Sequence, residues 1–341
     1  MLVNSSRLAL VISTLLVWLS STASAQNFRA GTDFWSPPKS VAECRASYRG
    51  IPPYKLSVTL AREPYPNDNA VNFVTTYGMW LSDIVAGRNI AKHKRKILQI
   101  AAADTFTKAH MGKGWSPIYV QSNLIRTTAM VIRALETKSQ LTSEERQILL
   151  NWGDKMIPGQ KQSRQNGSAD SRMASGVAMM SWGSVKDYPQ LVKAGYRKFI
   201  SGYDYVLNSS GKLRRHPAHR NVPIDTLSLE NEYNIALQHA VEGAAILDNL
   251  GLDLAKYTQN GKNLHTAVEW WADYLVKLPV QGKFTRAWSH NHHVGWIPIY
   301  VSKYSKQPAA SKLKAYSRKV TAGRTPKFRA ASLGGATECL W

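Results

Sequence analysis

Cysteine is scarce in this sequence. Only Cys44 and Cys339 occur among its 341 residues, and neither is accompanied by the residues that would support a cysteine nucleophile or a metal ligand. An oxidising compartment favours a disulfide between the two. The loop closed by such a bond is long, so the chain-entropy model assigns it about 5 kcal/mol of stabilisation.

Acidic residues are also few. The chain has 22 Asp and Glu against 44 Lys and Arg, and its net charge is +22. Such an excess attracts a polyanion and raises the rate of encounter with it. DNA, acidic lipid and uronic-acid glycans all fit this description. The basic residues are scattered rather than gathered into an arm or an amphipathic stripe, which disfavours a lipid surface. Part of the charge is equally compatible with an ordinary solvated surface.

Long hydrophobic runs are absent, apart from one. Residues 8–19 form an uncharged stretch that follows Arg7 and precedes a small-x-small pattern at 23–25, the features of a cleaved signal peptide. The run is too short to span a bilayer, and the alternative is an uncleaved anchor. We therefore expect residues 1–25 to be a signal peptide and residues 26–341 to be periplasmic or secreted. Export argues against nucleic acid as a partner, and no membrane association is expected after signal removal.

Convincing alternating strands and a Pro/Gly/Ser linker are missing too, apart from a short strand candidate at 55–60. Helical spacing dominates from residue 70 onward, as in Phe73, Tyr77 and Trp80, and Thr142 to Glu145 reads as a capping box. Pro158 and Gly159 are among the residues expected to punctuate the helices. The sequence predicts one all-α domain of antiparallel helix hairpins. Further helices are expected near 93–110, 119–138, 171–184, 189–207, 229–249, 262–277 and 309–318.

Four polar clusters interrupt the apolar pattern. The first is residues 63–69, either a functional turn or the N-cap of the next helix. The second begins a helix with Gln121, Asn123 and Arg126. The third, residues 159–176, is a polar loop that leads into a small-residue helix and suits an anion, or else is an ordinary solvated loop. The fourth, residues 228–240, carries Tyr233, Asn234 and His239, of which Tyr233 and His239 lie on different sides of a helix.

Aromatic and histidine residues in polar surroundings are further candidates. Most Trp residues sit at core spacing, but Trp115 and Trp288 do not, and an aromatic face beside cations is what a cleft for acidic sugars requires. The segment 289–293 contains His290 and His292. It lacks both the i, i+4 pair and the carboxylate of a metal site, so a substrate-contacting or merely exposed loop is preferred to a metal site.

Three segments resemble the alginate lyases that fold as incomplete α/α toroids. Residues 63–71, with Tyr65 and Asp68, resemble the lid segment of that family. Residues 212–254 resemble its stretch from a Gly-x-Leu turn through a basic segment to a helix ending in Gly-Leu-Asp. Residues 295–304 resemble its closing Trp-x-x-x-Tyr segment. The resemblance implies an α/α toroid, an incomplete barrel of antiparallel helix hairpins, spanning residues 26–341.

The sequence also departs from the family pattern. The family has an Asn-His pair where this chain reads NGSADSRM, so Asn166 can stand for the Asn but no His is present. The family's Tyr-His-Asn-Tyr run is replaced by residues 232–235, and Tyr233 fits a catalytic Tyr only after a shift of about half a turn. The basic residue of the lid is replaced by Asn69. A different substrate, a rearranged site or a site without catalysis would each produce these differences.

The resemblance implies β-elimination on a polyuronate such as alginate, without a cofactor. One group neutralises the C6 carboxylate, a base removes the C5 proton, and an acid protonates the leaving oxygen. A His acting as base would come from 290–293 or be His239. We expect a monomer that binds an acidic polysaccharide and holds no metal. The catalytic candidates are Tyr233, Asn166 and Arg172, and the substrate-binding candidates are Tyr65, Gln121, Asn123, Arg220, Trp288, His290 and His292.

Two other functions remain open at this point. A glycoside hydrolase on an α/α barrel would need two carboxylic acids across the scissile bond, and Asp170, Glu230 and Glu232 are available at polar helix starts. The scarcity of acidic residues disfavours it. A non-catalytic periplasmic binder of an acidic exopolysaccharide would account for the missing Asn-His pair.

Overall fold

The computed structural model describes residues 33–38, 68–107, 116–162, 169–207, 212–214, 227–254, 257–258, 261–277, 294–320, 329–330 and 335–341. These residues form helices and one short antiparallel strand pair, in which Arg329 pairs with Ala336. The elements are α3 (Asp68–Val85), α4 (Ile90–Ala102), α5 (Ser116–Thr137), α6 (Ser143–Gln162), α7 (Ala169–Val185), α8 (Pro189–Val206), α9 (Leu227–Asn249), α10 (Leu264–Leu275), α12 (Trp296–Lys303), α13 (Pro308–Val320), β1 (Arg329–Ala330), β2 (Gly335–Ala336) and α14 (Thr337–Leu340).

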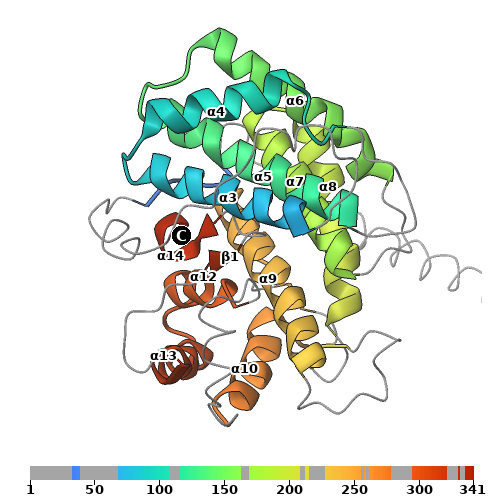
Figure 1. The fold of residues 1–341 in the computed structure, drawn as a ribbon. Coiled ribbons are helices and arrows are strands. Elements are labelled where there is room, and N and C mark those ends of the chain that lie inside the picture. Colours follow the sequence, from blue (N-terminus) through green and yellow to red (C-terminus); the bar gives the residue numbers. More distant parts are fainter. Residues whose placement is uncertain are drawn as a thin grey trace, which may run out of the picture.

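The helices follow one another as hairpins, α3 with α4, α5 with α6, α7 with α8, and α12 with α13 (Figure 1). The first helices of the first three hairpins pack in order, α3 against α5 and α5 against α7, and α9 packs against both α7 and α12. We call α5, α7 and α9 the inner helices. This arrangement is the all-α, α/α toroid expected from the sequence.

The inner helices run in the same direction. Near their C-terminal ends, Arg133 of α5 donates to the carbonyl of Ser184 in α7 at 3.3 Å. Ser184 accepts from the backbone N–H of Phe34, and the Phe34 carbonyl accepts from Asn249 at the end of α9. One end of the molecule therefore gathers the C-termini of α5, α7 and α9, and the opposite end gathers their N-termini.

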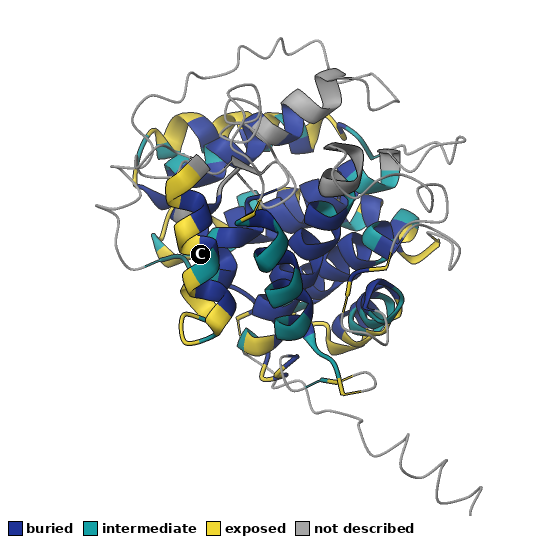
Figure 2. Ribbon diagram, turned by 90° about the horizontal axis from the view of Figure 1, so that it is seen from below, coloured by how far each residue is buried: buried dark blue, intermediate teal, exposed yellow. Residues whose placement is uncertain are grey.

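Most of α7 is buried, and Figure 2 shows that buried residues dominate the helices at the centre of the molecule. Glycine lets α8 approach α7 closely. A Cβ at Gly176 would lie 2.6 Å from the backbone nitrogen of Phe199, and one at Gly195 would lie 2.7 Å from the carbonyl oxygen of Gly176. Real Cβ atoms do not tolerate such distances, so the two backbones touch only because these positions are glycine. This contact fixes the hairpin at the centre of the molecule.

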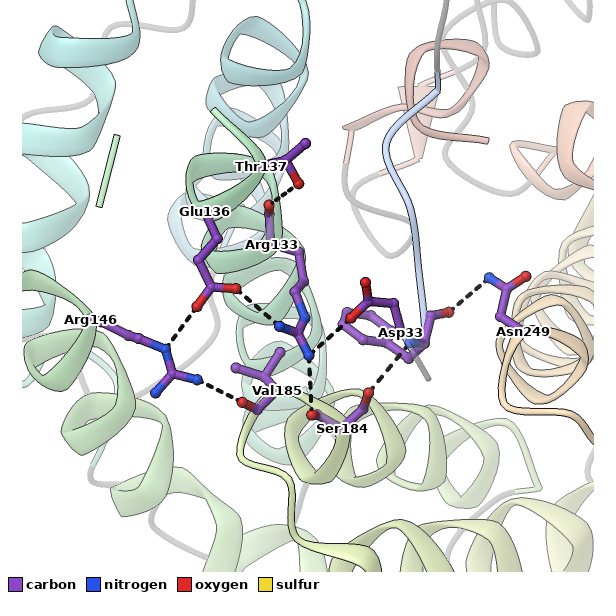
Figure 3. A network of polar contacts seen from close by, with 9 residues as sticks. Asp33, Arg133, Glu136, Thr137, Arg146, Ser184, Val185 and Asn249 are labelled. Carbon is purple, nitrogen blue, oxygen red and sulfur yellow. Dashed lines mark hydrogen bonds and ion pairs between the residues drawn. The ribbon is translucent and has the colours of Figure 1, made fainter. Parts of the chain in front are cut away.

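The C-terminal ends of α5 and α7 are tied together by arginines (Figure 3). Arg133 also bonds Glu136 at 3.1 Å, and Glu136 accepts from Nε of Arg146 at 2.8 Å. Arg146 donates in turn to the carbonyl of Val185 at 2.8 Å. Cations at a helix C-terminus satisfy free carbonyls and oppose the negative end of the helix dipole. The network therefore stabilises the end of α7.

The sequence predictions of helices are largely confirmed. The capping box at the start of α6 is present, with Thr142 and Glu145 bonded reciprocally at 3.0 and 3.2 Å. Two expectations are wrong. Pro158 and Gly159 do not end a helix but lie inside α6. The helix expected over 93–110 ends at Ala102.

Several sequence predictions fall outside the described residues. The signal peptide, the strand candidate at 55–60 and Cys44 are among them. Cys339 is buried and carries no free thiol, and its pairing with Cys44 stays a prediction. Among the described residues, no helix is long and apolar enough to cross a membrane.

Candidate active site at the N-terminal ends of the inner helices

Four of the predicted site residues lie on the inner helices. They are Gln121 and Asn123 of α5, Arg172 of α7 and Tyr233 of α9, all in the N-terminal half of their helix. The remaining six lie outside the described residues: Tyr65, Asn166, Arg220, Trp288, His290 and His292. In the sequence, Arg220 precedes α9, and the other five precede α3, α7 or α12, each the first helix of its hairpin.

On α5, Gln121 and Asn123 are both buried. The Gln121 side-chain amide donates to the carbonyl of Phe106 at 2.8 Å. It therefore holds the turn that ends with residue 107 against the beginning of α5. This contact does not test substrate binding by either side chain, which stays a prediction.

On α9, Tyr233 belongs to the core. Its side chain is 2% exposed, and its ring meets Trp270 and Trp271 edge-on, with centroids 5.4 and 4.9 Å away. The next residue, Asn234, accepts hydrogen bonds from the indole N–H groups of Trp271 and Trp296, both at 3.1 Å. This part of α9 is thus fastened to α10 and α12. Nothing here tests the catalytic role predicted for Tyr233, but the ring lies deep among tryptophans.

A tyrosine and a histidine from different inner helices meet in the same half of the molecule. Nε2 of His239 in α9 lies 3.0 Å from the hydroxyl oxygen of Tyr119 in α5. The rings are edge to face at 81°, with centroids 5.4 Å apart. His239 is buried, whereas Tyr119 is only partly buried. The hydroxyl and the ring nitrogen lie within hydrogen-bonding distance, so a proton can be shared between these two atoms.

A buried ion pair joins the same two helices. Nη1 of Arg126 lies 2.6 Å from Oε1 of Glu242, and the two side chains are 2% and 1% exposed. Burial raises the pKa of Glu242 to about 7, and the positive charge of Arg126 acts in the opposite direction. The sequence indicated Arg126 as a polar residue beside Gln121 and Asn123, but it did not indicate Tyr119 or Glu242.

Positive charge gathers near the beginning of α7. The guanidinium groups of Arg172 and Arg214 both lie over the ring of Tyr205, at 5.4 and 4.9 Å from its centroid. The N-terminus of α7 adds the positive end of its helix dipole. An anionic group is therefore favoured at this end of the molecule.

Two of the three carboxylates that a hydrolase could use lie among the described residues. Asp170 in the first turn of α7 and Glu232 in α9 are half-buried, and the side chain of Glu230 lies outside the described residues. Within the described ranges no three His, Cys, Asp or Glu side chains gather as a metal site. His290 and His292 lie outside these ranges.

A pocket of about 300 Å³ lies elsewhere, beside the loop that follows α9. Its lining includes Asp253, Tyr196 and Tyr257, and the hydroxyl of Tyr257 donates to Asp204 at 2.9 Å. Carboxylates disfavour an acidic ligand. This pocket is remote from the N-terminal halves of the inner helices, and we do not assign the predicted chemistry to it.

Comparison with known proteins identifies the fold. No family model matches the chain, and no curated protein matches it. Among solved structures, alginate lyase A1-III from Sphingomonas species A1 is similar with a TM-score of 0.61 at 15% identity, over 96% of this chain and 93% of that one. A histidine-to-alanine variant of that lyase, complexed with a tetrasaccharide, gives 0.62 at 16% identity over the same shares. An alginate lyase from Bacteroides ovatus gives 0.51 at 14%, over 73% and 70%.

These identities are too low to carry more than architecture. The resemblance to alginate lyases seen in the sequence is confirmed at that level, because the likeness covers nearly the whole of both chains. This chain folds as the α/α toroid of alginate lyase A1-III.

Proposed function

We propose that this protein is an exported polysaccharide lyase that cleaves an acidic, uronate-containing polysaccharide such as alginate by β-elimination. The observation that carries the proposal is the Tyr119–His239 pair, in which the two atoms are 3.0 Å apart and Tyr119 is partly exposed. Its setting supports it, because the fold is that of a lyase whose variants were complexed with a tetrasaccharide. The net charge of +22 suits a polyanionic substrate.

The pair has the chemistry that β-elimination requires. Neutral His239 accepts the hydroxyl proton of Tyr119 at Nε2, and the phenolate oxygen removes the C5 proton of the uronate. The C4–O4 bond breaks as the C4–C5 double bond forms, and the proton now on the tyrosine oxygen passes to O4. The histidine then returns its proton to the tyrosine system in the free enzyme. One tyrosine serves as base and acid in turn, which general acid–base catalysis permits when its pKa is matched to the step.

Tyr119 is a better carrier of this proton than Tyr233. A proton carrier must reach the substrate, and Tyr119 is partly exposed, whereas Tyr233 is 2% exposed beneath Trp270 and Trp271. We therefore assign the proton transfer predicted for Tyr233 to Tyr119, and we assign to His239 the task of accepting the hydroxyl proton of Tyr119.

The C6 carboxylate needs a partner that neutralises it, because this acidifies the C5 proton. Arg172 is our candidate among the described residues, since it stands in the first turn of α7 with Arg214 nearby. A guanidinium binds a carboxylate through two parallel hydrogen bonds. Asn166 and Arg220 remain proposals for the same task.

The deciding experiment is ultraviolet absorbance during incubation with alginate, its mannuronate and guluronate blocks, glucuronan and pectate. Rising absorbance from a new C4–C5 double bond supports the lyase and identifies its substrate. A flat trace with new reducing ends supports a hydrolase that uses carboxylates such as Asp170 and Glu232. If neither signal appears and one polymer still binds, the protein is a binder and the lyase proposal is wrong.

A further inference from the structure

Two polar contacts between α5 and α9 lie one above the other. Tyr119 and Arg126 are seven residues apart on α5, which is about two helical turns, so they share one face. Their partners, His239 and Glu242, are three residues apart on α9 and also share a face. The buried ion pair is thus a second polar side-chain contact between α5 and α9, beside the tyrosine–histidine pair, and the two helices both pack against α7.

The ion pair is a costly way to join two helices. Both side chains are almost fully buried, and taking two charges out of water offsets much of their attraction. The pKa of Glu242 is raised in spite of the adjacent arginine, so the folded protein disfavours its charge. Apolar residues of similar size hold buried helices together at least as well. Stability alone therefore does not account for the pair.

A charged pair does fix geometry more narrowly than an apolar contact. A side chain reaches about 5–6 Å from the helix axis, so a helix rotation of about 20° displaces its end by about 2 Å. That displacement would break the 3.0 Å contact between Tyr119 and His239. The 2.6 Å bond between Arg126 and Glu242 holds the same two helices against such a rotation.

We infer that Arg126 and Glu242 are positioning residues that hold α5 and α9 in the rotation at which Tyr119 and His239 share a proton. They act through that pair and do not touch the substrate. The inference rests on the proposed function where turnover is the readout. The geometry of the pair is a readout that does not depend on substrate.

The test separates positioning from stability with the double variant R126M/E242L, which replaces the ion pair by an apolar contact. We expect its thermal midpoint to equal or exceed that of the wild type. We also expect kcat on the active polyuronate to fall about 10- to 100-fold with little change in KM, because misplacement by about 1 Å can cost this much. Wild-type kcat in the folded double variant would overturn the inference.

Single variants keep the inference testable if the double variant does not fold. Glu242→Gln keeps a hydrogen-bond acceptor for Arg126, so we expect it to retain more kcat than Glu242→Leu. Equal kcat in the two single variants would contradict positioning. The control is K312M/E269L, which removes a partly exposed ion pair between α13 and α10 with a distance of 3.2 Å. We expect this control to leave kcat unchanged.

A substrate-free readout distinguishes failure of this inference from failure of the proposed function. The ¹⁵N chemical shifts of the His239 ring report whether Nε2 remains hydrogen-bonded. We expect the shift to change in R126M/E242L and to stay at the wild-type value in K312M/E269L. A changed shift supports positioning even if no polyuronate is cleaved, and an unchanged shift in R126M/E242L overturns it.

Discussion

Two arginines on one face of α5 show how differently the two ends of the inner helices are built. Arg126 is 2% exposed and is bonded to Glu242, with the Tyr119–His239 pair on its N-terminal side. Arg133, two turns further on, is 24% exposed and bonds Asp33 at 3.0 Å. The same residue type on the same helix thus serves a buried pair at one position and a solvated network at the next.

The two ends differ in whether the stability of the fold alone accounts for their polar groups. At the C-terminal end, Arg133 and Arg146 donate to the carbonyls of Ser184 and Val185, which are left free where α7 ends. These arginines complete the hydrogen bonds of the backbone. Towards the N-terminal end, Tyr119 and His239 contact each other side chain to side chain between α5 and α9. Proton transfer is the role that we propose for this pair.

The strongest test of this difference between the two ends is the Tyr119→Phe variant, which removes the hydroxyl oxygen of Tyr119. We expect turnover of the active polyuronate to fall about 10²- to 10⁴-fold, the usual contribution of a general acid or base. Binding should change little, and the free energy of unfolding should fall by about 1–3 kcal/mol, because buried His239 loses this hydrogen-bond partner. Absorbance of the unsaturated product measures turnover. Tyr233→Phe is the matched control, and a greater loss in that variant would return the catalytic role to Tyr233.

The Glu242→Gln variant tests whether the stability contributed by the buried ion pair depends on pH. The folded-state pKa of Glu242, about 7, lies above its ordinary value, so the folded protein holds the proton more tightly than the unfolded chain. This stabilisation is fully present below pH of about 4.5 and is lost as pH rises towards 7. It amounts to a few kcal/mol at most, at about 1.4 kcal/mol for each pH unit.

Urea unfolding of both proteins between pH 4 and pH 8 measures this effect. Arg126 is the charged group facing Glu242, and His239 lies one turn away on the same helix. Both remain in the variant, so the difference between the two curves isolates Glu242. We expect that difference to favour Gln increasingly as pH rises, and parallel curves would show that Glu242 does not titrate in this range.

Whether the sequence predicts a structural feature depends on how far apart in the sequence the contacting residues are. The capping box of α6 joins residues three positions apart, and helical spacing is read over a few turns, so both are visible in the sequence. The Tyr119–His239 and Arg126–Glu242 contacts join residues 120 and 116 positions apart. Both α5 and α9 pack against α7. The packing of α7 therefore decides which side chains of α5 and α9 face each other, and no local sequence pattern indicates this.

The same reasoning applies to Tyr233, whose predicted catalytic role stays a prediction. Its polar neighbours resembled a catalytic segment, yet they proved to be contacts of the core, with Asn234 bonded to Trp271 and Trp296. Buried tryptophan N–H groups need acceptors, and Asn234 provides one. A polar residue beside an apolar helix is compatible with either role until its partners are known.

A change at the centre of the molecule should affect both ends alike. In Gly176→Ala, the added methyl group would lie 2.6 Å from the Phe199 nitrogen and 2.7 Å from the Gly195 carbonyl. Both neighbours are backbone atoms and cannot rotate away. We expect a loss of about 1–3 kcal/mol in the free energy of unfolding, as in other overpacked cores. Urea unfolding measures it, and an unchanged midpoint would show that α7 and α8 can separate without cost.

The smallest effect is expected at the C-terminal end, with Arg133→Gln. This change weakens the contacts with Asp33, Glu136 and the Ser184 carbonyl, whose distances are 3.0, 3.1 and 3.3 Å. Because the arginine is partly solvated, we expect the free energy of unfolding to fall by only about 1–2 kcal/mol.

The control is Arg197→Gln, an exposed change on α8, whose free energy of unfolding should stay within about 0.5 kcal/mol of the wild type. Turnover for each folded molecule should be unchanged in both variants, since neither residue supports the Tyr119–His239 pair. A fall in kcat without loss of stability in Arg133→Gln would mean that the two ends of α5 are coupled.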